Sequence, residues 1–221
     1  MGGSIGAWLI RAGHDVVLVD TDAAHAAAIR ENGLRITGPV DEFTVEAYCT
    51  DPLRLDPGFK TVLLCVKAHH TSVALNVIGQ LLHEDGFVVS VQNGLNERGI
   101  AGAVGPERTV GCFVNFGADV LEPGVIMRGN RGAVVVGELD GVRTDRISAV
   151  HALFQDFDPD AVLTENIWGY LWGKLAYGSM LFATALADAS IADVLESAAH
   201  RPGIIGLARE AMAVAAARGV K

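Results

Sequence analysis

Continuous apolar runs separated by amphipathic segments dominate the first half of the chain. The runs "TVLLCVK" at 61–67 and "FVVSVQ" at 87–92 have the length of strands, and the segment near 71–82 between them has helical periodicity. A shorter apolar run, "DVVLVD" at 15–20, predicts a third strand, and residues 3–12 before it predict a helix. Continuous apolar strands that alternate with helices are typical of a parallel sheet covered on both faces.

The pattern changes after residue 109. Strand-like segments joined by glycine and proline turns fill 109–138 and predict an antiparallel extension of the sheet. A helix near 142–155 and a short strand at 161–164 follow, and the remainder is helical with one predicted break at 201–203. Thr164 is a residue type that favours a helix N-cap, so we expect the domain boundary close to it.

The opening stretch "MGGSIGAWLIRAGHDVVLVD" has features of a dinucleotide-binding fold. Gly2, Gly3 and Ser4 start a predicted helix, and the backbone N–H groups of a helix start favour a pyrophosphate. Asp20 lies eighteen residues after Gly2, close to the roughly 20-residue offset at which an acidic residue meets the ribose hydroxyls. The alternative is that glycine-rich helix starts are common and that Asp20 merely ends a strand.

These features predict an α/β fold with two domains. A Rossmann-type dinucleotide-binding domain is expected over 1–163, with its first strand missing because that fold normally begins with a buried strand. An all-helical substrate or dimerisation domain is expected over 164–221. A carboxylate at Asp20 would repel a 2′-phosphate, so this residue favours NADH over NADPH.

Composition narrows the functional classes. Half of the 221 residues are hydrophobic and the mean hydropathy is +0.33, which favours a large core and disfavours disorder. The net charge of −9 disfavours nucleic-acid and anionic membrane partners. The three cysteines have no zinc or disulfide spacing, no metal site is expected, and no signal peptide is evident, so we predict a cytoplasmic protein.

One lysine stands out in the apolar segment "NIWGYLWGKLAYGSMLFATALAD". Lys174 is the only charged side chain between Glu165 and Asp188. Three interpretations compete: a membrane span, a core helix whose lysine reaches the surface, and a lysine projecting into an interdomain cleft. In the third, Lys174 would donate a proton to a developing alkoxide and stabilise it. Lys174 shares one helical stripe with Ile167, Leu171, Gly178 and Phe182.

With these residues assembled, the chain resembles the ketopantoate reductase (2-dehydropantoate 2-reductase) family. The matching stretches are "MGGSIGAWLIRAGHDVVLVD", "LLCVKAHHT", "VSVQNGLNE", "EPGVIMRGNRGAVVVGEL" and "LWGKLAYGSMLFATAL".

The resemblance implies an NAD(P)-dependent oxidoreductase of pantothenate biosynthesis, with NADPH the usual cofactor and a small 2-keto acid as substrate. It assigns the catalytic, substrate-binding lysine to Lys174. It also places Lys67, Asn93 and Gly94 near the cofactor, and Asn93 near the substrate as well. A homodimer is a further possibility, because helix faces are apolar.

Departures from the family qualify this prediction. The family commonly has asparagines four and eight residues after its lysine, where this chain has Gly178 and Phe182. A more apolar 2-keto acid than ketopantoate would therefore fit better. The family also continues beyond the position of Lys221, so we expect a chain truncated at both ends. Two alternatives stay open: a nucleotide-binding fragment with impaired catalysis, and a related 3-hydroxyacid- or opine-type dehydrogenase.

Overall fold

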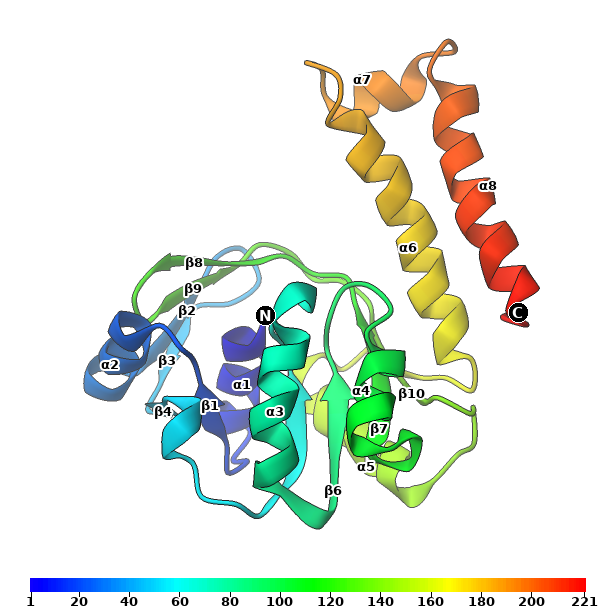
Figure 1. The fold of residues 1–221 in the computed structure, drawn as a ribbon. Helices are drawn as coiled ribbons and strands as arrows, with labels where there is room; N and C mark the ends of the chain where they lie inside the picture. The colour runs from blue at the N-terminus through cyan, green and yellow to red at the C-terminus, as the bar shows by residue number, and fades with distance from the viewer. The chain divides into compact units, whose positions relative to one another are not determined.

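The computed structural model describes residues 1–221 and divides the chain into two compact units, Met1–Glu165 and Asn166–Lys221. The first unit contains strands and helices, and the second contains helices alone (Figure 1). The predicted α/β class with a helical carboxyl-terminal part is therefore confirmed.

The main sheet of the first unit has five strands. Its order is β11-β10-β7-β6-β5, in which β5, β6 and β7 are parallel, β10 is antiparallel to β7, and β11 is parallel to β10. The predicted parallel sheet with an antiparallel extension is thus present. The strands are β5 (Phe59–Leu64), β6 (Leu82–Ser90), β7 (Thr109–Val114), β10 (Val134–Glu138) and β11 (Val162–Leu163).

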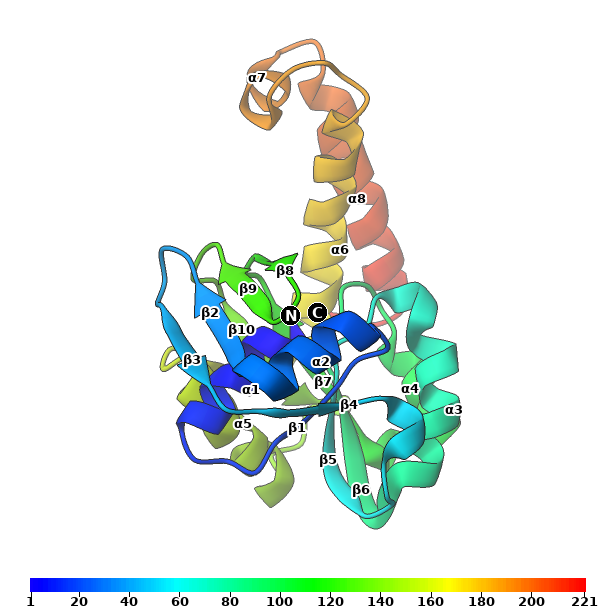
Figure 2. The same ribbon diagram turned by 90° about the vertical axis from the view of Figure 1, so that its left-hand side faces the viewer.

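Helices cover both faces of this sheet (Figure 2). On one face, Val88 of β6 packs with Ile78 of α3 (Thr71–Leu81) and Ile100 of α4 (Glu97–Val104). The next residue, Val89, belongs to the core on the other face, where α1 (Gly2–Arg11) and α5 (Asp145–Phe157) lie. Because successive side chains of a strand point to opposite faces, a continuous apolar run fills both cores.

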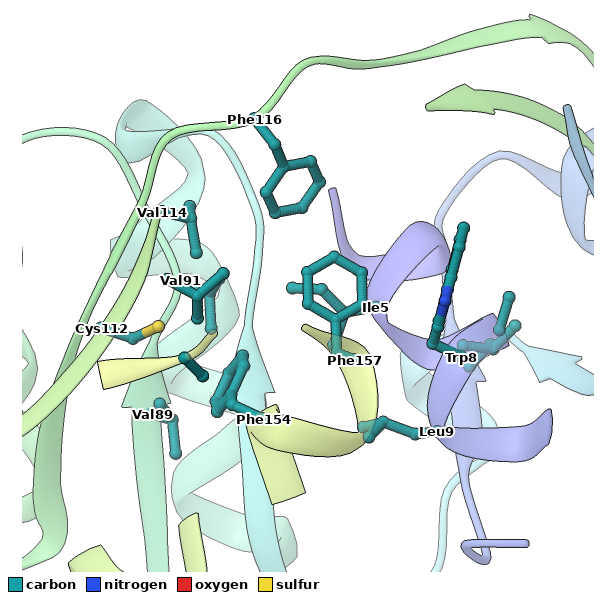
Figure 3. Packing of buried hydrophobic residues seen from close by; sticks show 14 of the residues in the cluster. Ile5, Trp8, Leu9, Val89, Val91, Cys112, Val114, Phe116, Phe154 and Phe157 are labelled. Atoms are coloured by element: carbon teal, nitrogen blue, oxygen red, sulfur yellow. The ribbon is translucent and has the colours of Figure 1, made fainter. Parts of the chain in front are cut away.

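The larger core lies between the sheet, α1 and α5. Figure 3 shows Phe157 next to Ile5 and Trp8 of α1, and Phe154 pointing toward the strands that carry Val89 and Cys112. The Trp8 and Phe157 rings meet edge to face with centroids 5.7 Å apart. This packing fixes the position of α1 relative to the sheet and α5, and therefore also the position of the amino-terminal end of α1.

Two smaller sheets complete the first unit. β1 (Val17–Val19) and β4 (Tyr48–Thr50) form a separate parallel pair. The four-stranded sheet has the order β3-β2-β9-β8, and its β8–β9 hairpin is antiparallel as predicted for 109–138. Its strands are β2 (Leu34–Thr37), β3 (Phe43–Val45), β8 (Ala118–Glu122) and β9 (Val125–Arg128).

Local signals explain the remaining elements of this unit. The Asp22 side chain caps α2 (Ala23–Asn32) by accepting the N–H groups of Ala24 and His25, and Gly33 ends that helix with φ +80°. The short 3₁₀ helices are η1 (Pro52–Arg54), η2 (Ala68–His70) and η3 (Pro106–Arg108).

The second unit consists of α6 (Ile167–Thr184), α7 (Ile191–Glu196) and α8 (Arg201–Ala217). No helix of the structure combines the length and the apolar character that crossing a membrane requires.

Two predictions for this region were wrong. Thr164 is not the N-cap: its N–H donates to Val136 O and so extends the pairing of β11. The helix begins later, at Ile167, and its cap is Asn166, which accepts the N–H of Gly169. The chain also does not break at 201–203, since helices are interrupted at 185–190 and 197–200. Pro202 instead lies in the first turn of α8, where a missing N–H breaks no helical hydrogen bond.

Candidate functional site

The start of α1 lies against the carboxyl end of β5. A Cβ atom at Gly2 would come within 3.1 Å of Cys65 Cβ, and one at Gly3 would come within 2.5 Å of Ile126 Cδ1, so both glycines permit a close approach. The first N–H groups of a helix have no acceptor inside the helix, and the helix dipole adds partial positive charge there. Gly2, Gly3 and the buried Ser4 therefore place helix-start N–H groups, a type of group that favours anions, beside the strand end.

Asp20 directly follows β1. Its N–H donates to Thr50 O at 3.1 Å, which extends the β1–β4 pairing by one residue. The exposed carboxylate accepts the N–H of Asp22 through Oδ1 at 2.9 Å. The side chain is thus held at the carboxyl end of a parallel strand, where ligands of open α/β sheets bind.

Lys67 belongs to the same edge of the unit. It lies three residues after the end of β5, caps η2, and its carbonyl accepts the N–H of His70 at 2.8 Å. Burial lowers the pKa of the Met1 amine, and Lys67 and Asp20 are among the charged groups that act on this amine. Asp20 and Lys67 are therefore both close enough to the start of α1 to act electrostatically on its amine.

Asn93 and Gly94 form the turn after β6. The parallel register pairs Leu64 of β5 with Ser90 of β6, so Asn93 follows its strand by the same three residues as Lys67 does. Gly94 has φ +102°, a conformation that disfavours other residues. The Asn96 side chain closes the turn by donating to Asn93 O at 2.9 Å, which leaves the Asn93 side chain on the exposed surface.

Buried polar side chains support this turn. Gln92 is 4% exposed, and its Nε2 donates to Val66 O at 2.7 Å and to Thr71 Oγ1 at 2.9 Å. Glu97, the first residue of α4, is fully buried beside the equally buried Ser90. Burial raises the pKa of Glu97, and both oxygens of its carboxyl group are buried without a hydrogen-bond partner. Sequence reasoning did not identify either role, although "QNG" lies in a stretch it singled out.

Lys174 belongs to the second unit. It lies in α6 with a partly buried side chain, on the stripe that also carries the buried Ile167 and Leu171. Further along the same stripe, Phe182 is 81% exposed. The structure thus brings the helix start, Asp20, Lys67 and Asn93–Gly94 to one edge of the first unit, whereas Lys174 belongs to the second unit.

The arrangement in the first unit has the chemistry of a nucleotide-binding edge. It combines helix N–H donors for a phosphate, a carboxylate for ribose hydroxyls, and a lysine and an amide at neighbouring strand ends. Comparison with known proteins agrees with this. The sequence model of the family described as "Ketopantoate reductase PanE/ApbA" matches residues 1–141. The chain belongs to the ketopantoate reductase family.

Individual proteins support this membership. The 2-dehydropantoate 2-reductase of Halobacterium salinarum is 27% identical over 224 residues, which cover 100% of this chain and 73% of that protein. The crystal structure of 2-dehydropantoate 2-reductase from Geobacter metallireducens has a TM-score of 0.84 at 28% identity and matches 95% of this chain and 70% of its own. The 2-dehydropantoate 2-reductase of Pyrococcus horikoshii is 30% identical over 184 residues, which cover 82% of this chain and 58% of that protein.

A more distant structure shares the fold alone. The ternary structure of D-mandelate dehydrogenase with NADH and anilino(oxo)acetate has a TM-score of 0.84 at 21% identity, and the match covers 98% of this chain and 71% of that one. Members of the ketopantoate reductase family are oxidoreductases, and the two-part architecture of this chain recurs in their structures.

Proposed function

We propose that this chain is an NAD(P)H-dependent reductase of a small 2-keto acid. The observation that carries the proposal is the shared edge of the first unit, where the α1 start, Asp20, Lys67 and Asn93–Gly94 lie at the ends of β1, β5 and β6. Membership of the ketopantoate reductase family supports the reaction class.

The residues of this edge fit a nicotinamide dinucleotide. Gly2, Gly3 and Ser4 would receive the pyrophosphate on backbone N–H groups, and Asp20 would accept hydrogen bonds from the ribose hydroxyls. Lys67 and Asn93 would hold the part of the dinucleotide that lies over β5 and β6. When bound, the reduced nicotinamide supplies the hydride. Since a carboxylate repels a 2′-phosphate, Asp20 favours NADH, whereas the family resemblance favours NADPH.

We assign the proton donor to Lys174. Reduction of a ketone adds one hydride to the carbonyl carbon and one proton to the carbonyl oxygen, which together give the hydroxyl group. An ammonium is able to supply that proton and stabilise the developing alkoxide. The support for Lys174 is its position as the one charged side chain of α6, partly buried among apolar residues.

The substrate in this proposal has an apolar side chain. The family's asparagine positions four and eight residues after the lysine are Gly178 and Phe182 here. Neither side chain donates or accepts a hydrogen bond, so a hydroxyl on the substrate would lose partners at about 1–3 kcal/mol each. A 2-keto acid with an alkyl or aromatic side chain avoids this cost.

Two experiments test the proposal. NADH and NADPH are titrated against the protein by nicotinamide fluorescence, and a panel of 2-keto acids is screened by the near-ultraviolet absorbance of the reduced nicotinamide. Binding of a dinucleotide and turnover of an apolar 2-keto acid are expected. Lys174→Ala should lower turnover by about 10²–10⁴-fold while dinucleotide affinity is retained.

Lys174→Arg serves as the matched variant because arginine keeps the positive charge and gives up no proton in this pH range. Slow turnover by both variants supports general acid catalysis. Unchanged turnover by Lys174→Ala would disprove the assignment of Lys174 as the proton donor.

A second candidate is a dinucleotide-binding protein with impaired catalysis, which the replacement of both asparagine positions by Gly178 and Phe182 favours. Binding without turnover across the panel distinguishes it from the reductase. Turnover of 3-hydroxyacids or opines in the oxidative direction would instead identify a related dehydrogenase.

A further inference from the structure

The Gln92 side chain joins the two segments that carry Lys67 and Asn93. Gln92 lies immediately before Asn93, in the turn after β6. Its Nε2 donates to the carbonyl of Val66, the residue before Lys67, and to the hydroxyl of Thr71, the first residue of α3. One buried amide group thus contacts both ends of segment 66–71 from the neighbouring strand.

The chemistry of the partners fixes the orientation of this amide. A backbone carbonyl only accepts hydrogen bonds, so the NH₂ group of Gln92 must face Val66 O and cannot exchange places with Oε1. Its second N–H then meets Thr71 Oγ1. The Oε1 atom is buried without a partner, and an unpartnered buried acceptor is costly. Gln92 therefore keeps both hydrogen bonds that its NH₂ group donates, although its Oε1 atom is left without a donor.

We propose that Gln92 is a positioning residue that holds the Lys67 segment and the Asn93–Gly94 turn in one arrangement for the dinucleotide. The proposal rests on the proposed function, which assigns Lys67 and Asn93 to the cofactor. Backbone pairing between the strands ends at Leu64 and Ser90, with one further bond from Val91 N–H to Leu64 O. Beyond that point the Gln92 side chain links the two segments through its hydrogen bonds to Val66 O and Thr71 Oγ1.

A positioning role differs from a packing role in its dependence on donated hydrogen bonds. Gln92→Glu has nearly the same shape, but its carboxylate has no donor for Val66 O. Thr71 is able to rotate its hydroxyl and donate to the carboxylate, whereas the carbonyl of Val66 is not. Protonation of the introduced carboxyl at low pH restores one donor. The effect of Gln92→Glu should therefore be reversed by acid, while that of Gln92→Leu should not.

Amide hydrogen exchange of the full chain tests the link directly. Relative to wild type, Gln92→Leu should increase exchange in 66–71 and in 91–96 together. Gln92→Glu should do so at pH 8 and recover toward pH 5. Thr71→Val removes one of the two acceptors in a near-isosteric way and should give a smaller change, while Thr71→Ser should match wild type. Gln80→Leu is the matched control, because the Gln80 amide donates only within its own helix, to Asn76 O.

Titration with NADH and NADPH tests the consequence for the cofactor. Gln92→Leu and, at pH 8, Gln92→Glu should weaken binding roughly tenfold, the equivalent of about 1.4 kcal/mol, with recovery of Gln92→Glu in acid. Lys67, His69, His70 and Glu97 also titrate or carry charge near these segments. The pH profile of the wild type, which contains the contributions of these four residues, is therefore subtracted from the profile of each variant.

The outcomes separate the two proposals. Unchanged exchange in 66–71 for Gln92→Leu and Thr71→Val would overturn the link. Increased exchange with unchanged dinucleotide affinity, or losses that Gln92→Glu shows equally at every pH, would overturn the positioning role. Wild-type protein that binds neither dinucleotide would overturn the proposed function, and the exchange data would still decide whether Gln92 couples the segments.

Discussion

The guanidinium of Arg128 donates to the carboxylate of Asp158 at 3.2 Å, and both side chains are buried. Arg128 ends β9, and Asp158 follows α5 directly. The guanidinium also lies 4.1 Å from the centroid of the Phe157 ring and 4.7 Å from that of Trp8. This ion pair therefore connects the four-stranded sheet to the α1–α5 side of the core.

Removing Arg128 should destabilise the first unit strongly. Arg128→Ala leaves a buried carboxylate without its partner, which typically costs about 3–5 kcal/mol. The free energy of unfolding in urea measures the effect. Arg11→Ala is a matched control, because Arg11 also lies over an aromatic ring, that of Phe43, and pairs with Asp41 at 2.7 Å at the surface. Solvent screens an exposed pair of this kind, so Arg11→Ala should have a much smaller effect. Equal effects of the two variants would contradict this prediction.

Glu97 should make the protein less stable as the pH rises from acid to neutral. Burial raises the pKa of Glu97 in the folded state above the usual value near 4.5. Above that value the folded state holds a proton that the unfolded state has released, so stability falls with increasing pH until the folded carboxyl also ionises. Glu97→Gln cannot ionise and should lose this part of the pH dependence.

The melting temperatures of wild type and Glu97→Gln, measured between pH 4.5 and 8, test this prediction. The difference between them should favour Glu97→Gln increasingly toward pH 8. Glu31→Gln, at an exposed position of α2, should follow the wild-type curve. Parallel curves for wild type and Glu97→Gln would show that the buried carboxyl does not control stability.

Cys65 should be unreactive in the folded protein. Burial of its thiol raises the pKa to about 11, so only about 10⁻³ of it is thiolate at pH 8, and the thiolate is the reactive form. We expect iodoacetamide to modify Cys65 far more slowly in native protein than in urea, as followed by mass spectrometry of the peptides. Burial also raises the pKa of Cys49, so Cys49 should likewise react more slowly with iodoacetamide in native protein than in urea. Rapid native alkylation of Cys65 would disprove the desolvation of its thiol.

The sequence predicted the elements whose causes are local. The runs at 61–67 and 87–92 are apolar on both alternating sides, which is sufficient to predict buried parallel strands. The end of α2 likewise has a local cause, because Gly33 adopts a positive φ that favours glycine. Thr164 was assigned the wrong role because strand pairing with Val136, a residue distant in sequence, extends to Thr164, and the helix starts only after Asn166. No local pattern reports such a partner.

The same distinction between local and long-range causes applies to the residues of the candidate site. Asp20, Lys67 and Asn93 could be located at strand ends from the sequence, because each follows an apolar run directly. Gln92 could not be given a role, since that role depends on the pairing of β5 with β6 and on the orientation of one amide. Lys174 was conspicuous as a single charge in an apolar helix, but that pattern alone left three interpretations open.

Asp20 should set the preference between the two dinucleotides if the proposed function is correct. Its carboxylate is exposed at the end of β1 and would face the ribose whose 2′ position carries the extra phosphate of NADPH. Asp20→Asn keeps the acceptor oxygen for Asp22 N–H and removes the charge. The ratio of the dissociation constants for NADPH and NADH should therefore fall, by roughly tenfold for a 1.4 kcal/mol repulsion.

Asp22→Asn is the control for this measurement. It changes the net charge by the same amount two residues away, and asparagine preserves the cap of α2. Its dissociation-constant ratio should stay close to that of wild type. Repulsion between exposed charges is screened by salt, so the difference between wild type and Asp20→Asn should also shrink as the ionic strength rises. A ratio that Asp20→Asn and Asp22→Asn alter equally would mean that net charge, and not the position of Asp20 beside the ribose, determines the preference.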